Sequence, residues 1–315
     1  MSTALVSGAC GLIGEKVCSG LLKKGYRVIA VDKSESEYNK NKENYVFFQA
    51  EQTDKEKYTE AFKSEPIDFF IHLACSADND FDNIIDDHCM GLSRSCDRFV
   101  YKLATEMQVS QIIMLSTTQV YEVKKSREPV REDDGVKPST NYGRLKGESE
   151  KALSFNIKKA KNIRCCVIRV PQIYTKDFIP NLHSKIVDPK DNIAFLYRTG
   201  DYGFHMCCLH NLVEFILGFM VSDPEIGLTG IYNVADPQPI TAEEIVCFMR
   251  EYHRLGPVVQ RNFTADSFLS KFSGKKSEKT DYRYLDVSNM LNNNRIDTNK
   301  AKRLSPFRWN ISNTK

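Results

Sequence analysis

The first half of the chain alternates short, mostly apolar runs with segments of helical periodicity. The apolar runs occupy residues 4–6, 27–31, 45–48, 69–73, 112–115 and 165–168. A helical pattern from Leu12 to Lys24 separates the first two runs, and Phe99, Val100 and Leu103 belong to another helical face. Strands that are apolar almost throughout are typical of sheets covered on both faces. The alternation therefore predicts an α/β fold with a doubly wound parallel sheet.

After about residue 170 this rhythm loosens, and prolines interrupt shorter segments. A chain of 315 residues corresponds to about two domain-sized units. We therefore expect a sheet domain over residues 1–170. Residues 171–315 are expected to form mainly a smaller, irregular C-terminal substrate lobe, with some segments returning to the sheet core.

Composition excludes several classes of protein. A net charge of +3 is too balanced for general electrostatic binding of nucleic acid. No apolar run approaches the length of a membrane span, and the N-terminus does not resemble a signal peptide. The ten cysteines follow neither a secreted disulfide framework nor zinc-type pairs. We expect a cytoplasmic protein that acts on a small molecule, without nucleic-acid or membrane partners.

Three glycines, Gly8, Gly11 and Gly14, follow the first predicted strand and lead into a helix. Such glycines allow a tight turn, close approach of a pyrophosphate to the backbone, and close packing of helix on strand. The N-terminus of the helix presents unpaired N–H groups to an anion. In this strand–turn–helix context, the spacing indicates a dinucleotide-binding site.

Asp32 ends the second predicted strand, where a carboxylate can accept hydrogen bonds from the adenosine ribose of a dinucleotide. A carboxylate there would repel a 2′-phosphate, so Asp32 favours NAD over NADP. The neighbouring Lys33 could accept that phosphate, and NADP therefore stays open.

Tyr142 and Lys146 stand four residues apart, which places both on one face if a helix begins here. A free tyrosine phenol has a pKa of about 10, and a nearby ammonium and an oxidised nicotinamide would both favour the phenolate. Ser116, Thr117 and Thr118 follow another predicted strand. Ligands bind at such carboxyl ends in open α/β sheets, so these residues suggest a site for proton transfer.

With these motifs in order, the chain resembles the extended short-chain dehydrogenases/reductases of the NAD-dependent epimerase/dehydratase family, which implies a Rossmann fold. The family's TGxxGxxG pattern corresponds to Ser7–Gly14, and its VIHLAA strand end to Phe70–Cys75. Its SSxxVYG segment corresponds to Ser116–Glu122, and YxxxK to Tyr142–Lys146. Weaker similarities at residues 230–234 and 284–287 extend the resemblance over nearly the whole chain.

The resemblance implies that Thr117 orients the substrate oxygen and that Tyr142 is the acid/base. It implies that Lys146 binds the nicotinamide ribose and lowers the pKa of Tyr142. It also implies a homodimer through the helices that begin near residues 88 and 142. The expected cofactor contacts are Gly8, Gly11, Leu12, Ile13, Gly14, Asp32, Lys33, Glu51, Gln52, Leu73, Ala74, Cys75, His88, Ser116, Tyr142, Lys146 and Pro171.

Several positions depart from the family pattern. His88 stands where we align the family's Asn. Thr118 and Gln119 replace the Asp–Glu pair of the dehydratases, which argues against 4,6-dehydration because neither side chain can serve as acid or base. Phe204 occupies the place of an Arg that binds the diphosphate of sugar nucleotides, and Arg198 or Arg283 could substitute for it. The expected substrate contacts are Thr118, Gln172, Arg198 and Arg283.

These features predict an enzyme, a sugar-nucleotide epimerase or ketoreductase that works by reversible hydride transfer. A dehydrogenase of a non-sugar alcohol and a non-catalytic NAD-binding protein are the alternatives. The soft-ligand cluster from His205 to His210 predicts no metal site, because successive side chains of an extended segment face opposite sides.

Overall fold

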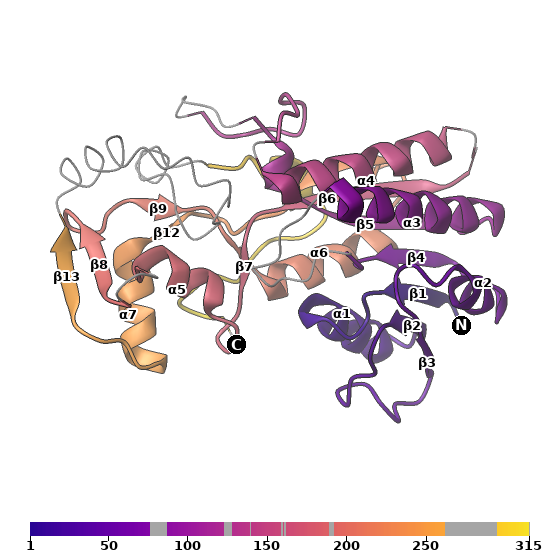
Figure 1. The fold of residues 1–315 in the computed structure, drawn as a ribbon, viewed down its shortest axis with the longest axis horizontal. Coiled ribbons are helices and arrows are strands. Elements are labelled where there is room, and N and C mark those ends of the chain that lie inside the picture. Colours follow the sequence, from indigo (N-terminus) through magenta and orange to yellow (C-terminus); the bar gives the residue numbers. More distant parts are fainter. Residues whose placement is uncertain are drawn as a thin grey trace.

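The computed structural model describes residues 1–75, 87–122, 128–138, 140–158, 160, 162–188, 192–261 and 295–314. Within these residues, seven strands form one parallel sheet in the order β11-β6-β5-β4-β1-β2-β3 (Figure 1). The strands are β1 (Thr3–Ser7), β2 (Arg27–Asp32), β3 (Tyr45–Gln49), β4 (Phe69–His72), β5 (Gln111–Thr117), β6 (Arg164–Val170) and β11 (Gly230–Asn233). The predicted doubly wound parallel sheet is confirmed.

Helices cover both faces of this sheet. They are α1 (Leu12–Lys23), α2 (Lys55–Lys63), α3 (Asp87–Glu106), α4 (Asn141–Ile157) and α6 (Leu209–Val221). In β2, Val28 and Ala30 join the core formed with α1 and α6, whereas Ile29 and Val31 join the core formed with α2, α3 and α4. Successive strand residues point to opposite faces, so burial of both faces requires apolar residues at every position.

A second lobe contains most of the remaining elements, and it has a core of its own. Its short strands pair two by two among the described residues: β10 with β7, β12 with β9, and β13 with β8. The elements are β7 (Ile173–Tyr174), α5 (Pro180–Ile186), β8 (Ala194–Tyr197), β9 (Gly203–Phe204), β10 (Cys207–Cys208), β12 (Ile240–Thr241), α7 (Ala242–Tyr252) and β13 (Val258–Arg261).

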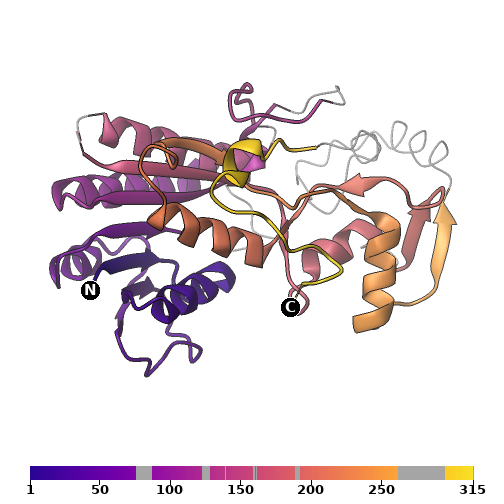
Figure 2. The same ribbon diagram turned by 180° about the vertical axis from the view of Figure 1, so that it is seen from behind.

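The C-terminal segment, which includes α10 (Asn299–Lys302), crosses α6 on its way from the sheet to the second lobe (Figure 2). Asn211 on α6 holds the C-terminal segment by two hydrogen bonds. Asn211 Nδ2 donates to Trp309 O at 2.8 Å, and Asn211 Oδ1 accepts from Trp309 N at 3.0 Å. The same Nδ2 also donates to Asp236 Oδ1 at 2.8 Å. The contacts of Asn211 therefore join α6, the chain that follows β11, and the C-terminal segment.

None of the helices in the described ranges combines the length and apolar character needed to cross a membrane.

Candidate active site

The turn between β1 and α1 leaves no room for side chains at two of its glycines. Gly8 has a φ of +72°, and a Cβ there would lie 2.7 Å from Ala74 N. A Cβ on Gly14 would lie 2.0 Å from Gly8 O, so the first turn of α1 packs directly on the glycine turn. No side chain caps α1 at Gly11. The residues at this turn therefore fit a bound pyrophosphate, which accepts hydrogen bonds from exposed N–H groups at such a helix end.

Asp32 lies at the end of β2, beside this glycine turn. Its Oδ2 accepts a hydrogen bond from Cys10 N at 2.9 Å, which directs the carboxylate toward the turn. Lys33 is exposed, and Leu12 and Ile13 are half-buried at the start of α1. The structure thus brings Asp32 next to the glycines, as the position of an adenosine-binding carboxylate requires.

Glu51 and Gln52, two of the expected cofactor contacts, differ in their surroundings. Glu51 is exposed, whereas Gln52 donates from Nε2 to Asp97 Oδ1 at 3.0 Å. The other amide atom, Gln52 Oε1, is buried and has no donor among the described residues. A buried acceptor without a partner costs about 1–3 kcal/mol. The amino group of an adenine could supply the missing donor, so Gln52 fits the proposed dinucleotide.

A chain of buried polar groups runs beneath the strand ends. Ser7 Oγ lies 2.6 Å from His72 Nδ1, and His72 Nε2 lies 3.0 Å from Asp97 Oδ1. Burial opposes ionisation of Asp97, but the hydrogen bond from His72 and the charge of Lys146 lower its pKa. An ionised Asp97 can only accept, so His72 Nε2 donates the hydrogen bond between them.

Helix α4 carries Tyr142 and Lys146, and its N-terminus is held by two contacts. Thr140 caps the helix by accepting from Gly143 N at 3.0 Å, and it donates to Gln119 Oε1 at 2.8 Å. A Cβ on Gly143 would lie 2.4 Å from Gln119 O. The start of α4 therefore lies directly against η1 (Thr118–Val120), which follows Thr117 at the end of β5.

Lys146 is a buried cation, 4% exposed, one helical turn after Tyr142. Burial acts against its charge, but Cys75, Tyr142 and Asp97 raise its pKa above the ordinary value. Cys75 comes from the end of β4, next to Leu73 and Ala74 at the glycine turn. The structure thus gathers Tyr142, Lys146 and the β4 strand end into one site, with the ammonium kept charged.

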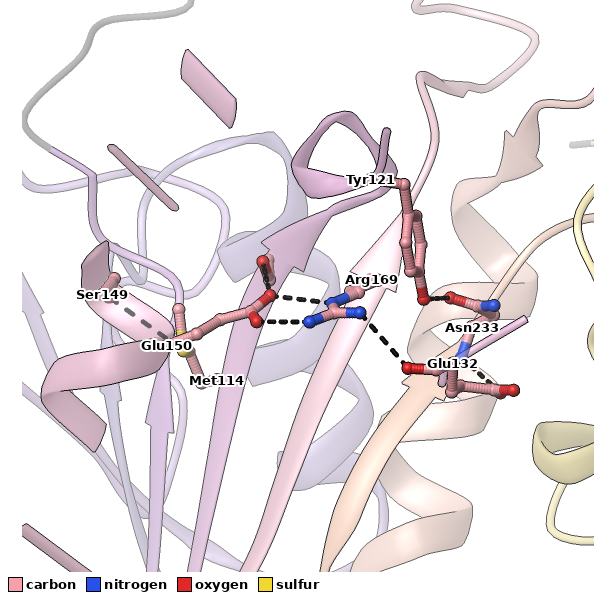
Figure 3. Close-up of polar contacts among 8 residues, drawn as sticks. Met114, Tyr121, Glu132, Ser149, Glu150, Arg169 and Asn233 are labelled. Carbon is pink, nitrogen blue, oxygen red and sulfur yellow. Dashed lines mark hydrogen bonds and ion pairs between the residues drawn. The ribbon is translucent and has the colours of Figure 1, made fainter. Parts of the chain in front are cut away.

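Glu150, one turn beyond Lys146, binds three elements together (Figure 3). Its carboxylate accepts from Arg169 Nε at 3.0 Å and Arg169 Nη2 at 2.7 Å, and from Ser116 Oγ at 2.5 Å. The guanidinium also lies 4.6 Å from the ring centroid of Tyr121, whose hydroxyl donates to Asn233 Oδ1 at 2.6 Å. The hydroxyl of Ser116, an expected cofactor contact, is therefore directed at Glu150.

The remaining expected cofactor and substrate contacts lie in separate parts of the fold. Pro171 and Gln172 are half-buried just beyond β6, and Thr118 is half-buried in η1. The side chain of His88 is exposed near the start of α3, and Arg198 is exposed in the turn between β8 and β9. Arg283 lies outside the described residues.

Sequence reasoning missed Asp97 and Glu150. Two signals could have found them: Asp97 lies on the predicted apolar face of its helix, and Glu150 continues the four-residue spacing of Tyr142 and Lys146.

The side chains of the His205–His210 cluster have protein partners. His205 Nδ1 accepts from Ile296 N at 2.7 Å, and His205 Nε2 lies 2.8 Å from Asp236 O. The His210 ring lies 5.0 Å from the Trp309 ring, and Cys207 and Cys208 are buried. Over the described ranges, no group of three or more His, Cys, Asp or Glu side chains is placed to hold a metal ion.

Comparison with known proteins identifies a family and a fold. The model of the NAD dependent epimerase/dehydratase family matches residues 4–216. No curated protein matches the sequence. A UDP-glucose 4-epimerase from Thermotoga maritima, solved with UDP-glucose, has a TM-score of 0.68 at 19% identity, over 95% of this chain and 91% of that one.

Two proteins from Bacillus cereus have similar folds. A UDP-glucuronic acid 4-epimerase, solved with UDP-glucuronic acid and NAD, has a TM-score of 0.70 at 16% identity, over 98% of this chain and 95% of that one. A UDP-N-acetylglucosamine 4-epimerase has a TM-score of 0.70 at 14% identity, over 99% of this chain and 93% of that one. At these identities the likeness establishes the fold.

Proposed function

The chain belongs to the NAD-dependent epimerase/dehydratase family, a family of NAD-using enzymes, and from this membership we propose that it is a sugar-nucleotide epimerase or ketoreductase. The solved structures with similar folds include epimerases of UDP-glucose, UDP-glucuronic acid and UDP-N-acetylglucosamine. Their substrates share a nucleoside diphosphate attached to a sugar, and we propose the same class of substrate for this chain.

The observation that carries the proposal is the buried Lys146 ammonium beside Tyr142. A cation in a low-dielectric site favours the phenolate form of a neighbouring tyrosine. Tyr142 would then accept the proton of a secondary hydroxyl, and the Thr117 hydroxyl would hydrogen-bond the same substrate oxygen. A protein that only binds a dinucleotide has no need of this pair.

Bound NAD supplies the chemistry of accepting a hydride from the substrate carbon and returning it. The glycine turn and Asp32 would hold the dinucleotide, and Lys146 would orient its ribose. In the epimerase reaction, Tyr142 would return the proton to the same oxygen after the sugar has turned over. In the ketoreductase reaction, Tyr142 would donate a proton to a carbonyl that arrives from solution.

The test is a panel of UDP-, GDP- and dTDP-sugars added to the NAD-loaded protein. We expect one nucleotide class to raise the melting temperature beyond NAD alone, since a ligand at about 100 times its Kd adds about 2.7 kcal/mol. Chromatography of the sugar products would then separate epimerisation, which leaves NAD unchanged overall, from oxidation of the sugar with formation of NADH, the reverse of the ketoreductase reaction.

Failure of all three classes to stabilise the protein or to react would overturn the sugar-nucleotide proposal. Turnover of alcohols would then favour the dehydrogenase alternative. NAD binding without turnover of either class would favour the non-catalytic one.

We also propose that the protein is a homodimer through α3 and α4. The resemblance to the family supports this proposal, and in the structure the two helices pack against each other. Light scattering of the purified protein would measure the mass, and a monomer at micromolar concentration would contradict this proposal.

A further inference from the structure

The buried carboxylate of Asp236 lies where the sheet meets the second lobe. Asp236 follows the end of β11 by three residues, and its side chain is fully buried. Tyr174 OH on β7, Cys208 N at the end of β10 and Asn211 Nδ2 on α6 each donate a hydrogen bond to this carboxylate, within 2.8 Å. β7 and β10 belong to the second lobe, whereas β11 and α6 belong to the sheet and its cover. A single side chain therefore connects the two lobes.

The C-terminal segment adds a second connection at the same place. Phe307 is buried in the core that α1 and α6 form on the sheet, and Ile311 is buried in the core of the second lobe. Trp309, between them, is held by Asn211, the same side chain that donates to Asp236. Figure 2 shows this segment crossing α6. We call Asp236, Asn211 and Trp309 the interlobe joint.

The hydrogen bonds that Asp236 accepts all come from neutral groups. Within the described ranges, no Lys, Arg or His side chain forms an ion pair with its carboxylate, and burial raises the pKa of Asp236 to about 6. An ionised carboxylate is therefore less stable inside the joint than in water, and water that enters the joint would stabilise it.

The titratable side chains that face Asp236 stay neutral around pH 6. They are Tyr174 on β7, Cys207 and Cys208 on β10, and His205 just before β10. Burial raises the pKa of the phenol and of both thiols, and it lowers the pKa of His205 to about 4. Asn211 and Trp309, from α6 and the C-terminal segment, do not titrate. The charge of this cluster therefore changes near pH 6 through Asp236.

We propose that Asp236 makes the interlobe joint sensitive to pH: the protonated carboxyl group keeps the joint closed to water, and the ionised carboxylate favours its local opening. By linkage, a group that holds its proton more tightly in the closed joint shifts the balance toward the open joint as the pH rises. Opening would release β7 and the C-terminal segment from α6, so the second lobe would move more easily relative to the sheet above about pH 6. β7 directly follows Gln172, so an expected substrate contact would gain freedom as well.

Native-state hydrogen exchange tests this proposal at two amides of the joint. Cys208 N donates to Asp236, and Trp309 N donates to Asn211. The carboxyl pKa is about 6 in the closed joint and about 3.9 in an open, hydrated one, so the opening constant should rise about fiftyfold from pH 4 to pH 7, after correction for the intrinsic exchange rate. Low urea concentrations should leave this exchange unchanged, because local opening exposes little surface.

Three variants separate Asp236 from its neighbours. Asp236→Asn keeps the size of the side chain and removes its ionisation, so the opening constant at both amides should no longer change with pH. Tyr174→Phe removes a donor to the carboxylate, so the midpoint of the change should move to higher pH. His210→Gln should retain the fiftyfold change, although the His210 ring lies 5.0 Å from the Trp309 ring.

Asp201→Asn is the matched control, since Asp201 is an exposed carboxyl group and its replacement should also retain the change. An opening constant that does not rise with pH in the wild type, or that rises equally in Asp236→Asn, would overturn the inference. A rise that depends on urea and is shared by Val28 N in the sheet would report global unfolding, and it would overturn the inference too. None of these outcomes bears on the proposed function.

Discussion

The buried charges near the site differ in how neighbouring residues compensate them. Lys146 gains from Tyr142, Asp97 and Cys75, and its pKa rises despite burial. Among the described residues, Lys185 on α5 has the Phe204 ring 5.5 Å away and no carboxylate partner, and burial lowers its pKa to about 8. A cation that keeps its charge can stabilise a neighbouring phenolate. The environment of Lys146 therefore fits the role that we propose for it.

The first prediction concerns the Tyr142 phenol. Tyr142→Phe should reduce turnover by about a hundredfold or more, because general acid–base catalysis contributes about 10²–10⁴. The Kd for NAD, measured by calorimetry, should change little. Tyr252→Phe, an exposed tyrosine on α7, is the control. Full activity in Tyr142→Phe would remove Tyr142 from the acid/base role.

The second prediction concerns cofactor preference. Asp32→Ala should weaken NAD binding about tenfold or more and NADP binding less, because the lost carboxylate no longer binds the ribose or repels a 2′-phosphate. The ratio of the two Kd values measures the effect. An unchanged ratio would mean that residues other than Asp32 recognise the ribose.

At the scale of elements, α4 is the part of the fold that positions the chemistry. Thr140 caps its start, η1 lies against that start, and Glu150 anchors it to β6 and β5 two turns further on. Tyr142 and Lys146 lie between these two attachments. The distance of Tyr142 and Lys146 from Thr117 therefore depends on contacts that neither of these two side chains makes.

The third prediction tests this anchor. Glu150→Gln leaves Arg169, 2% exposed, without its counter-charge, and breaking a buried pair costs about 3–5 kcal/mol. Urea unfolding should show that loss, and kcat should fall more than the affinity for NAD.

Glu148→Gln is the matched control on the same helix. Glu148 is 31% exposed and pairs with Lys151 at 2.8 Å, and such a surface pair contributes about 0–1 kcal/mol. Equal stabilities of the two variants would contradict the anchoring role of Glu150.

At the scale of the whole molecule, the buried Asp236 connects the sheet to the second lobe. Tyr174 OH and Cys208 N donate to its carboxylate at 2.5 and 2.6 Å, and Asn211 Nδ2 at 2.8 Å. Burial raises the pKa of Asp236 to about 6, although these hydrogen bonds act in the opposite direction. A carboxyl group with a raised pKa at this junction makes the stability of the whole fold depend on pH.

The fourth prediction follows from that pKa. Because the pKa of Asp236 lies above the unfolded value, the folded protein holds the proton more tightly. This stabilisation is complete below about pH 3 and is lost as the pH rises through about 6. The free energy of unfolding of the wild type minus that of Asp236→Asn should fall by about 2 kcal/mol between pH 4 and pH 7. Asp201→Asn, at an exposed turn, should show no such slope. If the difference in unfolding free energy between the wild type and Asp236→Asn does not change with pH, the raised pKa of Asp236 is contradicted.

Local patterns in the sequence were sufficient to predict the parallel sheet, the glycine turn and the neighbourhood of Tyr142 and Lys146. Apolar runs, glycine spacing and a four-residue repeat are consequences of backbone geometry over a few residues, so they can be read without knowing the fold. The positions of Asp32 at a strand end and of Thr117 at another followed from the same rules.

The tertiary structure alone decided which distant groups meet. Asp97 contacts His72 and Gln52, and Glu150 contacts Arg169 and Ser116. These contacts form because crossover connections bring separate strands to one edge of the sheet. Whether a buried lysine has an anionic partner likewise depends on contacts between elements far apart in the chain. Spacing along the sequence carries no information about such contacts, because they depend on how the chain folds back on itself.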